Sequence, residues 1–569
     1  MLLFSSPLPP WMIVLLSTSR LPSSRSFLLH RAKNYYNYNY NYRQPSNTQY
    51  ASERMTAKVL MTTKPEDTST MDFNSSTNTR RSNSNTGGGR FSLSNRIVHT
   101  LDPCVVKTKE WIEQYAHLWE GGESGQQGIY SLAQGVVYWK PPPSCRRALV
   151  DAVVGNDDGD EINEDSDPLA LHSYSPARGL PELIDALEKK ISAEHGMSDH
   201  DITVTVGANQ AYMNVVLTLL GAKDNNDRGS GGKAVVFAPY YFNHVMAIQM
   251  CAGPEALVVG PTNMITGVPD IDWLKRTLEE HKPKDGDTAG TTNGIRLATL
   301  VNPGNPTGVA LSRSKVKEIV DLCKEYGVWL VLDCTYEHFF NTGNNNNKIG
   351  GDDEDESKIN PLPTFPDDPH VIHVFSFSKG YAMAGYRCGY LVTHKDDAAS
   401  SNTERGEFLR QMLKVQDTIP IGPPRLSQHV ALGALRQGTT TPVSESPLSY
   451  SFSSKEWVYQ KYATLDSSRN LILDALSSLP QQIGGSGSMY VMGKLPDDID
   501  LVVEDDDEPV DVLFCRRLVK DYGIAIIPGS FCGTPGWIRI CYANLTPDKT
   551  VVAAERLRKG IEELVGDKP

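Results

Sequence analysis

A lysine at the end of a strand-like run is the residue of this chain best suited to covalent chemistry. Lys379 follows the apolar run Val371–Phe375, with Ser376 and Ser378 just before it and Arg387 eight residues later. An amine beside hydroxyl groups and a guanidinium can form a Schiff base with a carbonyl compound that also carries an anionic group. The competing interpretation is a surface lysine that happens to end a strand.

Other strand-like runs end in residues that suit the same ligand. Val328–Leu332 leads into Asp333, whose carboxylate can hold a protonated ring nitrogen or simply cap a helix. Asn305, in a turn rich in proline and glycine, can bind a polar group or stabilise the turn. Ile202–Val206 leads into small residues and a helix expected to start near Ala211, where backbone N–H groups can bind a phosphate. Small residues are also common at such turns for steric reasons.

The elements that position these residues are predicted by the spacing of short β-branched runs. Six runs alternate with helix-length segments: Ile202–Val206, Ala234–Phe237, Leu297–Val301, Val328–Leu332, Val371–Phe375 and Gly389–Val392. This alternation predicts a mostly parallel sheet with helices on both faces, and ligands bind such sheets at the carboxyl ends of the strands. A final unit begins near Lys455 and ends in a helix expected over Pro547–Leu564.

Composition limits the classes of function open to the chain. Its 569 residues include 55 Lys+Arg and 68 Asp+Glu, and the net charge of −13 argues against nucleic acid as a partner. The nine cysteines never stand in a C-x-x-C pair, which argues against a disulfide framework or a zinc site and predicts no bound metal. No apolar run approaches the roughly 20 residues of a membrane span, so no membrane association is expected.

The first 95 residues do not show the sequence pattern of a folded domain, because their apolar residues follow neither a helix nor a strand period. Five Lys and Arg residues precede Glu53, the first acidic residue. A basic, serine-containing and acid-free leader resembles a mitochondrial or plastid transit peptide. The alternative is an extension without a targeting role, which would leave the protein in the cytoplasm.

Taken in order, these motifs resemble one family, the fold-type I, class I/II pyridoxal-phosphate aminotransferases. The matching elements are Tyr174…Gly179, Gly207-Ala-Asn-Gln210, Pro239-Tyr-Tyr-Phe-Asn243, Asn305-Pro-Thr-Gly308, Asp333-x-x-Tyr336, Ser376-x-Ser-Lys379 with Arg387, and Trp537-Ile-Arg539. Several independent matches in one order are more specific than any single motif. The resemblance implies an α/β fold, with a mostly parallel seven-stranded sheet flanked by helices and a smaller α+β domain.

The resemblance also implies an order of domains. Residues 1–95 would be a disordered leader, 96–170 an N-terminal arm with part of the small domain, 171–430 the large cofactor-binding domain, and 431–569 the rest of the small domain. Four polar insertions are expected to be disordered surface loops: Gly155–Pro168, Lys223–Lys233, Asn341–Pro363 and Gly438–Ser454.

Cofactor roles follow from the positions that match the family. Lys379 would hold pyridoxal 5′-phosphate as a Schiff base and then move the substrate's Cα proton. Asp333 would pair with the pyridinium nitrogen, and His244 would either support Asp333 or only pack beside it. The other cofactor-binding residues would be Asn305 and Tyr336 at the ring 3-oxygen, Tyr241 on the ring face, and Ala208, Asn209, Ser376, Ser378, Arg387 and the partner subunit's Tyr174 at the phosphate. A tyrosine supplied by a partner implies a homodimer with shared sites.

The substrates implied are an amino acid and a 2-oxo acid. Arg539 would bind the α-carboxylate, and Gly135 would leave backbone room beside it. Relatives selective for dicarboxylates carry a second arginine in the stretch that aligns with Lys414–Pro424. This stretch has no arginine here, and Asp417 would repel a second carboxylate.

Four stretches look most like a plant aminotransferase that acts on aromatic amino acids and methionine: Ser131–Trp139, Pro239–Asn243, Phe375–Lys379 and Gln416–Ile421. Tyr138 and Trp139 would then form an aromatic wall for the substrate side chain, unless both pack in the domain core. A β-lyase or an aminocyclopropane-carboxylate synthase on the same fold is the nearest alternative, because it shares the cofactor residues. A non-catalytic, cofactor-binding regulator is a remote one, because the leader shows no DNA-binding pattern.

Overall fold

The structure is a computed structural model that describes residues 93–119, 128–154, 169–221, 231–282, 294–341, 362–395, 404–436, 452–499, 501 and 508–566. The predicted leader lies outside the described residues except for residues 93–95. The insertion Gly155–Pro168 and most of the other three predicted insertions also lie outside them. No helix in the described part of the chain is both long and apolar enough to cross a membrane.

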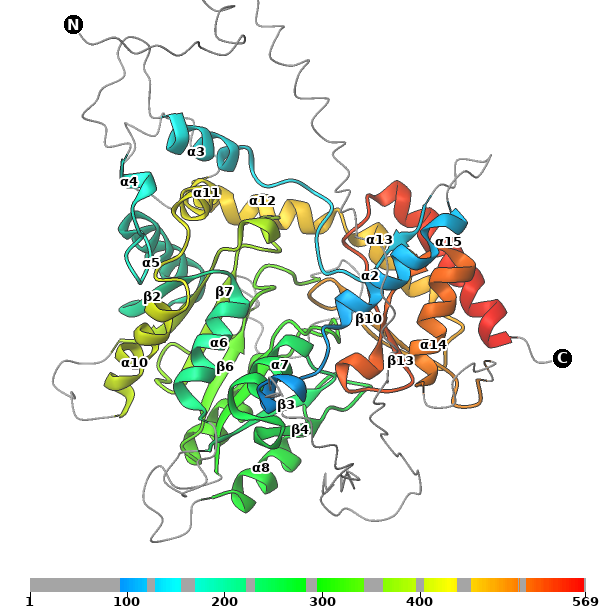
Figure 1. The fold of residues 1–569 in the computed structure, drawn as a ribbon, viewed down its shortest axis with the longest axis horizontal. Coiled ribbons are helices and arrows are strands. Elements are labelled where there is room, and N and C mark those ends of the chain that lie inside the picture. Colours follow the sequence, from blue (N-terminus) through cyan, green and yellow to red (C-terminus); the bar gives the residue numbers. More distant parts are fainter. Residues whose placement is uncertain are drawn as a thin grey trace, which may run out of the picture. The chain divides into compact units, whose positions relative to one another are not determined.

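A seven-stranded sheet forms the centre of the larger domain (Figure 1), in the order β2-β8-β7-β6-β5-β3-β4. Its strands are β2 (His200–Thr205), β3 (Lys233–Ala238), β4 (Leu257–Pro261), β5 (Ile295–Val301), β6 (Trp329–Asp333), β7 (Val371–Ser376) and β8 (Gly389–His394). The strands from β7 to β4 pair in parallel, and β8 runs antiparallel to both of its neighbours. The predicted α/β fold with a mostly parallel seven-stranded sheet is confirmed.

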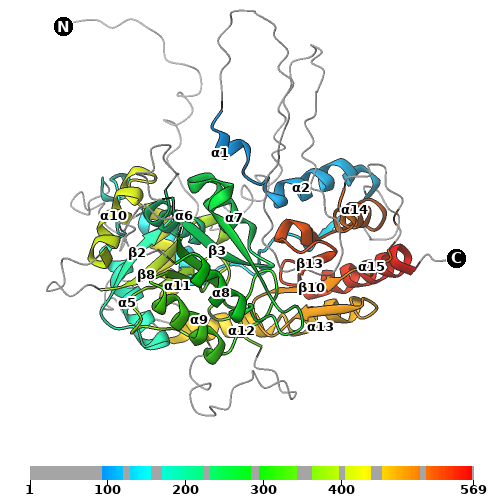
Figure 2. The same ribbon diagram turned by 90° about the horizontal axis from the view of Figure 1, so that it is seen from below.

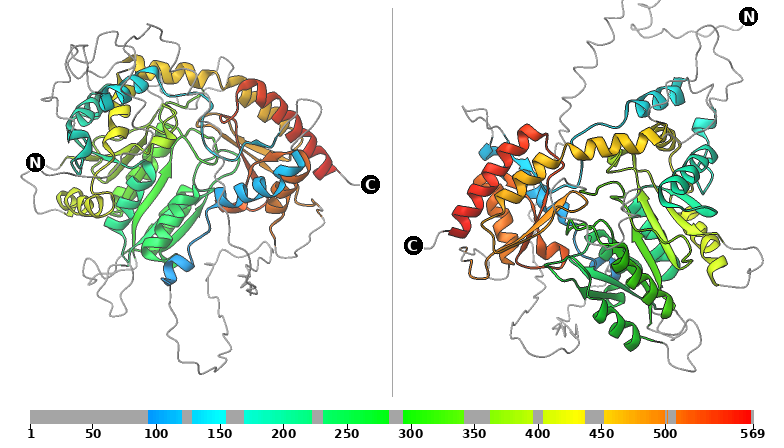
Figure 3. Two further views of the ribbon diagram at one scale, coloured as in Figure 1. Left: turned by 45° about the horizontal axis from the view of Figure 1, so that its top comes forward. Right: turned by 180° about the vertical axis from the view of Figure 1, so that it is seen from behind.

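Helices cover both faces of this sheet, because successive strand side chains point to opposite sides. In β6, Val331 packs into one buried cluster, while Leu330 and Leu332 pack into the other. The first cluster includes α6 (Ala208–Leu219), α7 (Phe242–Ala252) and α10 (Glu404–Thr418). The second includes α5 (Pro181–His195), α8 (Ile271–Glu280), α9 (Arg313–Glu325) and α11 (Arg425–Leu435). Figure 3 shows the two helical layers with the sheet between them.

The smaller domain is built on a four-stranded antiparallel sheet in the order β12-β13-β10-β9. Its strands are β9 (Gln481–Gly484), β10 (Tyr490–Lys494), β12 (Ile527–Pro528) and β13 (Trp537–Cys541). The helices are α13 (Asp466–Ala475), α14 (Val510–Arg517) and α15 (Pro547–Gly566), and α15 confirms the helix predicted over Pro547–Leu564. The N-terminal region contributes β1 (Tyr130–Ser131), which pairs in parallel with β11 (Ile524–Ala525). The predicted smaller α+β domain is therefore present.

The segment before β1 contacts both domains (Figure 2). The short helix α1 (Asn95–Val98) lies against α7, where the Arg96 guanidinium donates to the carbonyl oxygen of Cys251. Helix α2 (Cys104–Tyr115) packs instead beside β12 of the smaller domain.

The remaining elements are η3 (Ala116–Trp119), α3 (Pro143–Val154), α4 (Leu169–His172), η4 (Pro254–Ala256), η5 (Ala384–Tyr386), α12 (Phe452–Ala463), η7 (Leu518–Tyr522) and η8 (Gly529–Cys532). Because α11 spans the boundary predicted at residue 431, we propose that the change of domain comes after Leu435.

Candidate active site

Lys379 lies in the loop after β7, half-buried, and its ammonium donates a hydrogen bond to the carbonyl oxygen of Gly135. Burial lowers the pKa of Lys379 to about 8; Cys541 opposes this shift, and the positive charges of Arg539 and Arg387 reinforce it. An amine with this pKa is partly neutral near pH 7, which attack on a carbonyl carbon requires. The position therefore suits a nucleophile.

The carboxylate of Asp333 lies at the end of β6, and its Oδ2 is 3.2 Å from Nε2 of His244. Burial alone would raise the pKa of Asp333, but the hydrogen bond and charge of His244 hold it below its usual value. The ring of Tyr212, a residue that the sequence analysis did not single out, packs on His244 with 4.0 Å between ring centroids. Packing and hydrogen bonding together keep a buried anion at this strand end.

The first turn of α6 and the segment between β7 and β8 form a candidate anion site. The helix begins at Ala208, three residues before the predicted start, and no side chain caps it. A side chain on Gly207, which has φ 80°, would lie 2.6 Å from the guanidinium of Arg387. The Ser376 hydroxyl accepts a hydrogen bond from the backbone N–H of Ser378 at 3.1 Å. Free N–H groups at a helix start, two hydroxyl groups and a guanidinium suit a phosphate.

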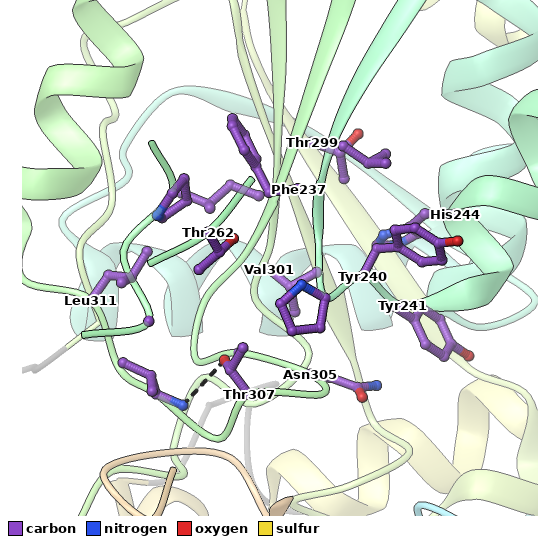
Figure 4. A pocket seen from close by; sticks show the side chains of 17 residues that line it. Phe237, Tyr240, Tyr241, His244, Thr262, Thr299, Val301, Asn305, Thr307 and Leu311 are labelled. Carbon is purple, nitrogen blue, oxygen red and sulfur yellow. Dashed lines mark hydrogen bonds between the residues drawn. The ribbon is translucent and has the colours of Figure 1, made fainter. Parts of the chain in front are cut away.

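Tyr241 and Asn209 stand beside this anion site. The Tyr241 hydroxyl donates to Oδ1 of Asn209 at 3.3 Å and accepts from Nδ2 of Asn243 at 2.8 Å. Tyr241, His244 and Asn305 also line a pocket at the carboxyl ends of β3 and β5 (Figure 4). The candidate site therefore continues into a pocket on this side.

Arg539 of β13 connects the two domains within the site. Its Nη1 donates to Oδ1 of Asn305 at 3.3 Å, and its Nη2 donates to the carbonyl oxygen of Ala133 at 2.5 Å. Its Nε is buried and has no hydrogen-bond partner among the described residues. A buried guanidinium with an unsatisfied donor suits a carboxylate ligand.

Tyr490 of β10 is a site residue that the sequence analysis missed. Its hydroxyl oxygen lies 2.9 Å from that of Tyr336, and the Arg539 guanidinium lies over its ring, 4.7 Å from the centroid. Tyr336 also accepts a hydrogen bond from Nδ2 of Asn305 at 3.4 Å. A side chain on Gly135 would lie 2.0 Å from the Tyr490 hydroxyl oxygen, so this approach requires glycine. Only an apolar strand pattern marks Tyr490 in the sequence, and that pattern does not identify its partners.

The two residues predicted to form an aromatic wall differ in their surroundings. Trp139 is buried in the hydrophobic core, and its Nε1 donates to the carbonyl oxygen of Gly380, the residue after Lys379, at 3.3 Å. Tyr138 is half-buried, and its hydroxyl lies 2.7 Å from Oγ1 of Thr464. Trp139 therefore packs in the core, as the competing interpretation had it, but at a position next to the lysine.

Tyr174 lies on the surface, with 78 % of its area exposed. The guanidinium of Arg425 donates to its carbonyl oxygen at 3.2 Å, which fixes the backbone of this segment. Three exposed apolar residues, Ile419, Ile421 and Leu426, belong to the neighbouring segment that ends in α11. Exposed apolar side chains therefore occur on both of these neighbouring segments.

A buried cluster of ionisable residues lies on the other side of the Asp333–Tyr336 loop. Oxygen and nitrogen atoms of Glu194, Glu337 and His338 come close enough together to bind a metal ion. The ammonium of Lys190, however, lies 2.5 Å from Oε2 of Glu337 and 3.4 Å from Oε2 of Glu194. The protein's own cation thus holds the position between the two carboxylates that a metal ion would take.

Comparisons with known proteins identify the family of this chain. The family model for aminotransferase class I and II matches residues 131–557. The aromatic aminotransferase ISS1 of Arabidopsis thaliana is 36 % identical over 437 residues, which cover 76 % of this chain and 90 % of the relative. An aspartate/prephenate aminotransferase of Thermus thermophilus is 24 % identical over 393 residues, which cover 68 % of this chain and 81 % of the relative.

Solved structures show the same fold. The aspartate aminotransferase of Thermus thermophilus with maleate has a TM-score of 0.61 at 22 % identity, over 83 % of this chain and all of that one. An aromatic aminotransferase of Pyrococcus horikoshii has a TM-score of 0.57 at 21 % identity, over 80 % and 99 % of the two chains. Enzymes of class I and II generally depend on pyridoxal phosphate. The family model and the Arabidopsis relative establish that the chain belongs to the class I and II aminotransferases and is a pyridoxal-phosphate-dependent transaminase.

Proposed function

We propose that this transaminase moves the α-amino group of an aromatic amino acid or methionine to a 2-oxo acid, with its cofactor bound at Lys379. The observation that carries the proposal is the half-buried Lys379 amine, with its pKa lowered to about 8 in a site that also contains Asp333 and Arg539. Such an amine can form and release a covalent bond to a carbonyl carbon, and it can accept a proton from the substrate.

The residues present fit pyridoxal phosphate at both of its ends. The phosphate would be held by the start of α6, Ser376, Ser378 and Arg387. The absence of a side chain on Gly207 supports this role, because it leaves space for the guanidinium of Arg387. Asp333 would hold the protonated ring nitrogen, with His244 keeping the carboxylate ionised. The bound group supplies a carbonyl carbon for the amine and a ring that accepts the electrons left when the Cα proton departs. Tyr241 would cover the ring, and Asn305 and Tyr336 would bind its 3-oxygen.

The substrate would be held by its α-carboxylate. Arg539 points two nitrogens at polar partners and keeps Nε without one, which supports a carboxylate contact there. The stretch Lys414–Pro424 offers no second guanidinium for a distal carboxylate, and Asp417 opposes one by its charge. Trp139 packs in the core and would border the substrate site only through its contact with Gly380, the residue after Lys379. The Arabidopsis relative is named an aromatic aminotransferase, which supports aromatic amino acids as donors here.

A homodimer with shared sites accompanies this proposal. Tyr174, which matches a phosphate-binding residue contributed across the family's dimer, is exposed together with Ile419, Ile421 and Leu426. Exposed apolar side chains on two neighbouring segments, one of which carries Tyr174, support a subunit interface.

A panel of amino donors tests the proposed substrate class. Tyrosine, phenylalanine, tryptophan, methionine and aspartate would each be offered to the purified protein with pyruvate or 2-oxoglutarate. We expect aromatic donors and methionine to give one 2-oxo acid for each amino group transferred, and aspartate to react at least 10-fold more slowly. Strong aspartate activity would contradict the apolar pocket. Ammonia and an elimination product without amino transfer would identify a lyase instead.

The substitution Arg539→Ala tests the carboxylate contact. It should raise KM for the amino acid and for the 2-oxo acid alike, by about 10- to 100-fold, because both present the same carboxylate to a charged hydrogen-bond donor. Arg539→Lys keeps the charge but loses the planar two-donor geometry, so it should recover only part of the binding. Steady-state kinetics with each substrate varied in turn measures both values. A KM that changes for one substrate alone would show that Arg539 binds something other than the shared carboxylate.

A further inference from the structure

We infer that Tyr490 is a positioning residue that links the carboxylate-binding Arg539 to Tyr336, so that the small domain sets the hydrogen bonding of Tyr336 inside the cofactor site. This inference rests on the proposed function and extends it to a residue outside the motifs that identify the family. It assigns separate roles to the hydroxyl group and to the ring of Tyr490.

Four residues form a closed circuit of contacts across the boundary between the domains. Asn305 donates to Tyr336 at 3.4 Å, Tyr336 and Tyr490 share a hydrogen bond at 2.9 Å, and Arg539 donates to Asn305 at 3.3 Å. The circuit closes where the Arg539 guanidinium lies over the Tyr490 ring. All four side chains are less than 10 % exposed, so water does not compete with these contacts.

The strand pairing of the small domain places the Tyr490 side chain beside Arg539. Tyr490 lies opposite Cys541 in the antiparallel pair of β10 and β13, so its side chain is on the same face as Arg539, two residues before Cys541. The rings of Tyr490 and Tyr336 meet edge to face, with centroids 5.8 Å apart and an interplanar angle of 82°. Gly135 lets the Tyr490 hydroxyl approach the backbone that also accepts a hydrogen bond from Lys379.

The number of protons on the two hydroxyl groups decides whether Tyr490 donates to Tyr336 or accepts from it. Burial raises the pKa of both Tyr336 and Tyr490, so each keeps its single O–H proton near neutral pH. If Tyr336 uses that proton to donate to the ring 3-oxygen of the cofactor, it has none for Tyr490. Tyr490 must then donate to Tyr336, and a phenol that accepts a hydrogen bond becomes a stronger donor itself. Tyr490 would thereby strengthen the contact of Tyr336 with the ring oxygen.

The test compares Tyr490→Phe and Tyr490→Leu in the enzyme loaded with pyridoxal phosphate. Tyr490→Phe removes the hydroxyl and keeps the ring under Arg539. The visible absorbance of the cofactor bound at Lys379 changes with pH, and we expect the midpoint of that change to rise by about 0.5 to 1 unit, because the neutral hydrogen bond from Tyr490 to Tyr336 is lost. KM should change less than about twofold. Tyr490→Leu also removes the ring, so the midpoint should rise in the same way and KM for both substrates should increase roughly 2- to 30-fold.

Tyr462→Phe is the matched control. Tyr462 forms another buried tyrosine pair, with its hydroxyl oxygen 3.5 Å from that of Tyr542. Its ring stacks on Phe339, and within the described part of the chain no hydrogen bond or ring contact joins it to Arg539 or Tyr336. It should leave the absorbance midpoint and both KM values unchanged, whatever it does to thermal stability. A purely structural role for Tyr490 would lower thermal stability in Tyr490→Phe without moving the midpoint.

Separate outcomes contradict the two proposals. If the wild-type protein binds pyridoxal phosphate covalently and transaminates, but Tyr490→Phe keeps the wild-type midpoint, the role given to the hydroxyl is wrong and the proposed function stands. Equal KM values for Tyr490→Leu and Tyr490→Phe would remove the role given to the ring. A wild-type protein that forms no visible band with pyridoxal phosphate would contradict the proposed function, and this inference with it.

Discussion

Lys379→Ala should lower the rate of transamination by about 10⁴-fold or more, because in the proposed function this one side chain would supply both the covalent attachment and the base that moves the Cα proton. The contacts proposed for the phosphate and the ring nitrogen would not involve the lysine, so the variant should still bind pyridoxal phosphate without a covalent bond. Borohydride reduction followed by mass spectrometry measures this difference. The wild-type chain should gain the mass of one cofactor, and the variant should gain none.

Lys395→Ala provides the control for this substitution. Lys395 is exposed at the end of β8, where its ammonium lies 2.7 Å from Oδ1 of Asp199. This contact raises the pKa of Lys395, in contrast to the lowered pKa of Lys379, so Lys395 stays charged and unreactive near neutral pH. The control should keep full activity and full covalent labelling. Covalent labelling that persists in Lys379→Ala would show that another lysine holds the cofactor.

The fold was predictable to the extent that buried parallel strands are continuous apolar runs. The six predicted strands end within two residues of the observed ones. The strand that the runs did not reveal is β4, at the edge of the sheet, whose half-exposed residues Leu257–Pro261 end in glycine and proline. Its apolar run Leu257–Val259 is short and is followed at once by Gly260 and Pro261, which are uncommon inside strands, so this run alone does not identify a strand.

The site was predictable where residues follow strands directly, and less so where distant segments meet. Asp333 and Lys379 could be recognised because each stands at the carboxyl end of a central strand. Tyr212 and Tyr490 could not, because their roles depend on contacts with His244 and Tyr336, 32 and 154 residues away along the chain. Trp139 shows the same limit, since its neighbour Gly380 lies 241 residues away. Spacing within a motif does not encode such contacts.

Lys190→Met should lower the free energy of unfolding by about 3–5 kcal/mol, because it removes the ammonium that lies between two buried carboxylates and leaves them with histidine partners alone. Lys190 is fully buried, and its ammonium is 2.5 Å from Glu337 and 3.4 Å from Glu194. Burial would raise the pKa of Glu337, but the charges of Lys190 and His338 lower it to about 2. Urea titration at pH 7 measures the loss.

The exposed pair of Lys317 and Asp321 gives the matched control. Lys317 is joined to Asp321 four residues later on a helix, as Lys190 is to Glu194, but about half of each side chain is exposed. Lys317→Met should therefore cost no more than about 0.5 kcal/mol. Equal losses in the two variants would show that burial adds nothing to the Lys190 contacts.

The pH dependence of the stability lost in Lys190→Met shows whether the loss comes from the missing charge or from the missing side-chain packing. A carboxyl group with a lowered pKa stabilises the folded state at pH values above its unfolded pKa, near 4.5 for Glu337, and this contribution disappears as the pH falls towards 2. In Lys190→Met the same carboxylates keep only their histidine partners, His195 at Glu337 and His338 at Glu194, so burial favours their protonated form more than in the wild type. The stability difference between wild type and variant should thus be largest above pH 5 and shrink as the pH falls from 4.5 towards 2. A difference that is the same at pH 3 and pH 7 would assign the effect to lost side-chain packing, since the volume of the removed ammonium does not change with pH.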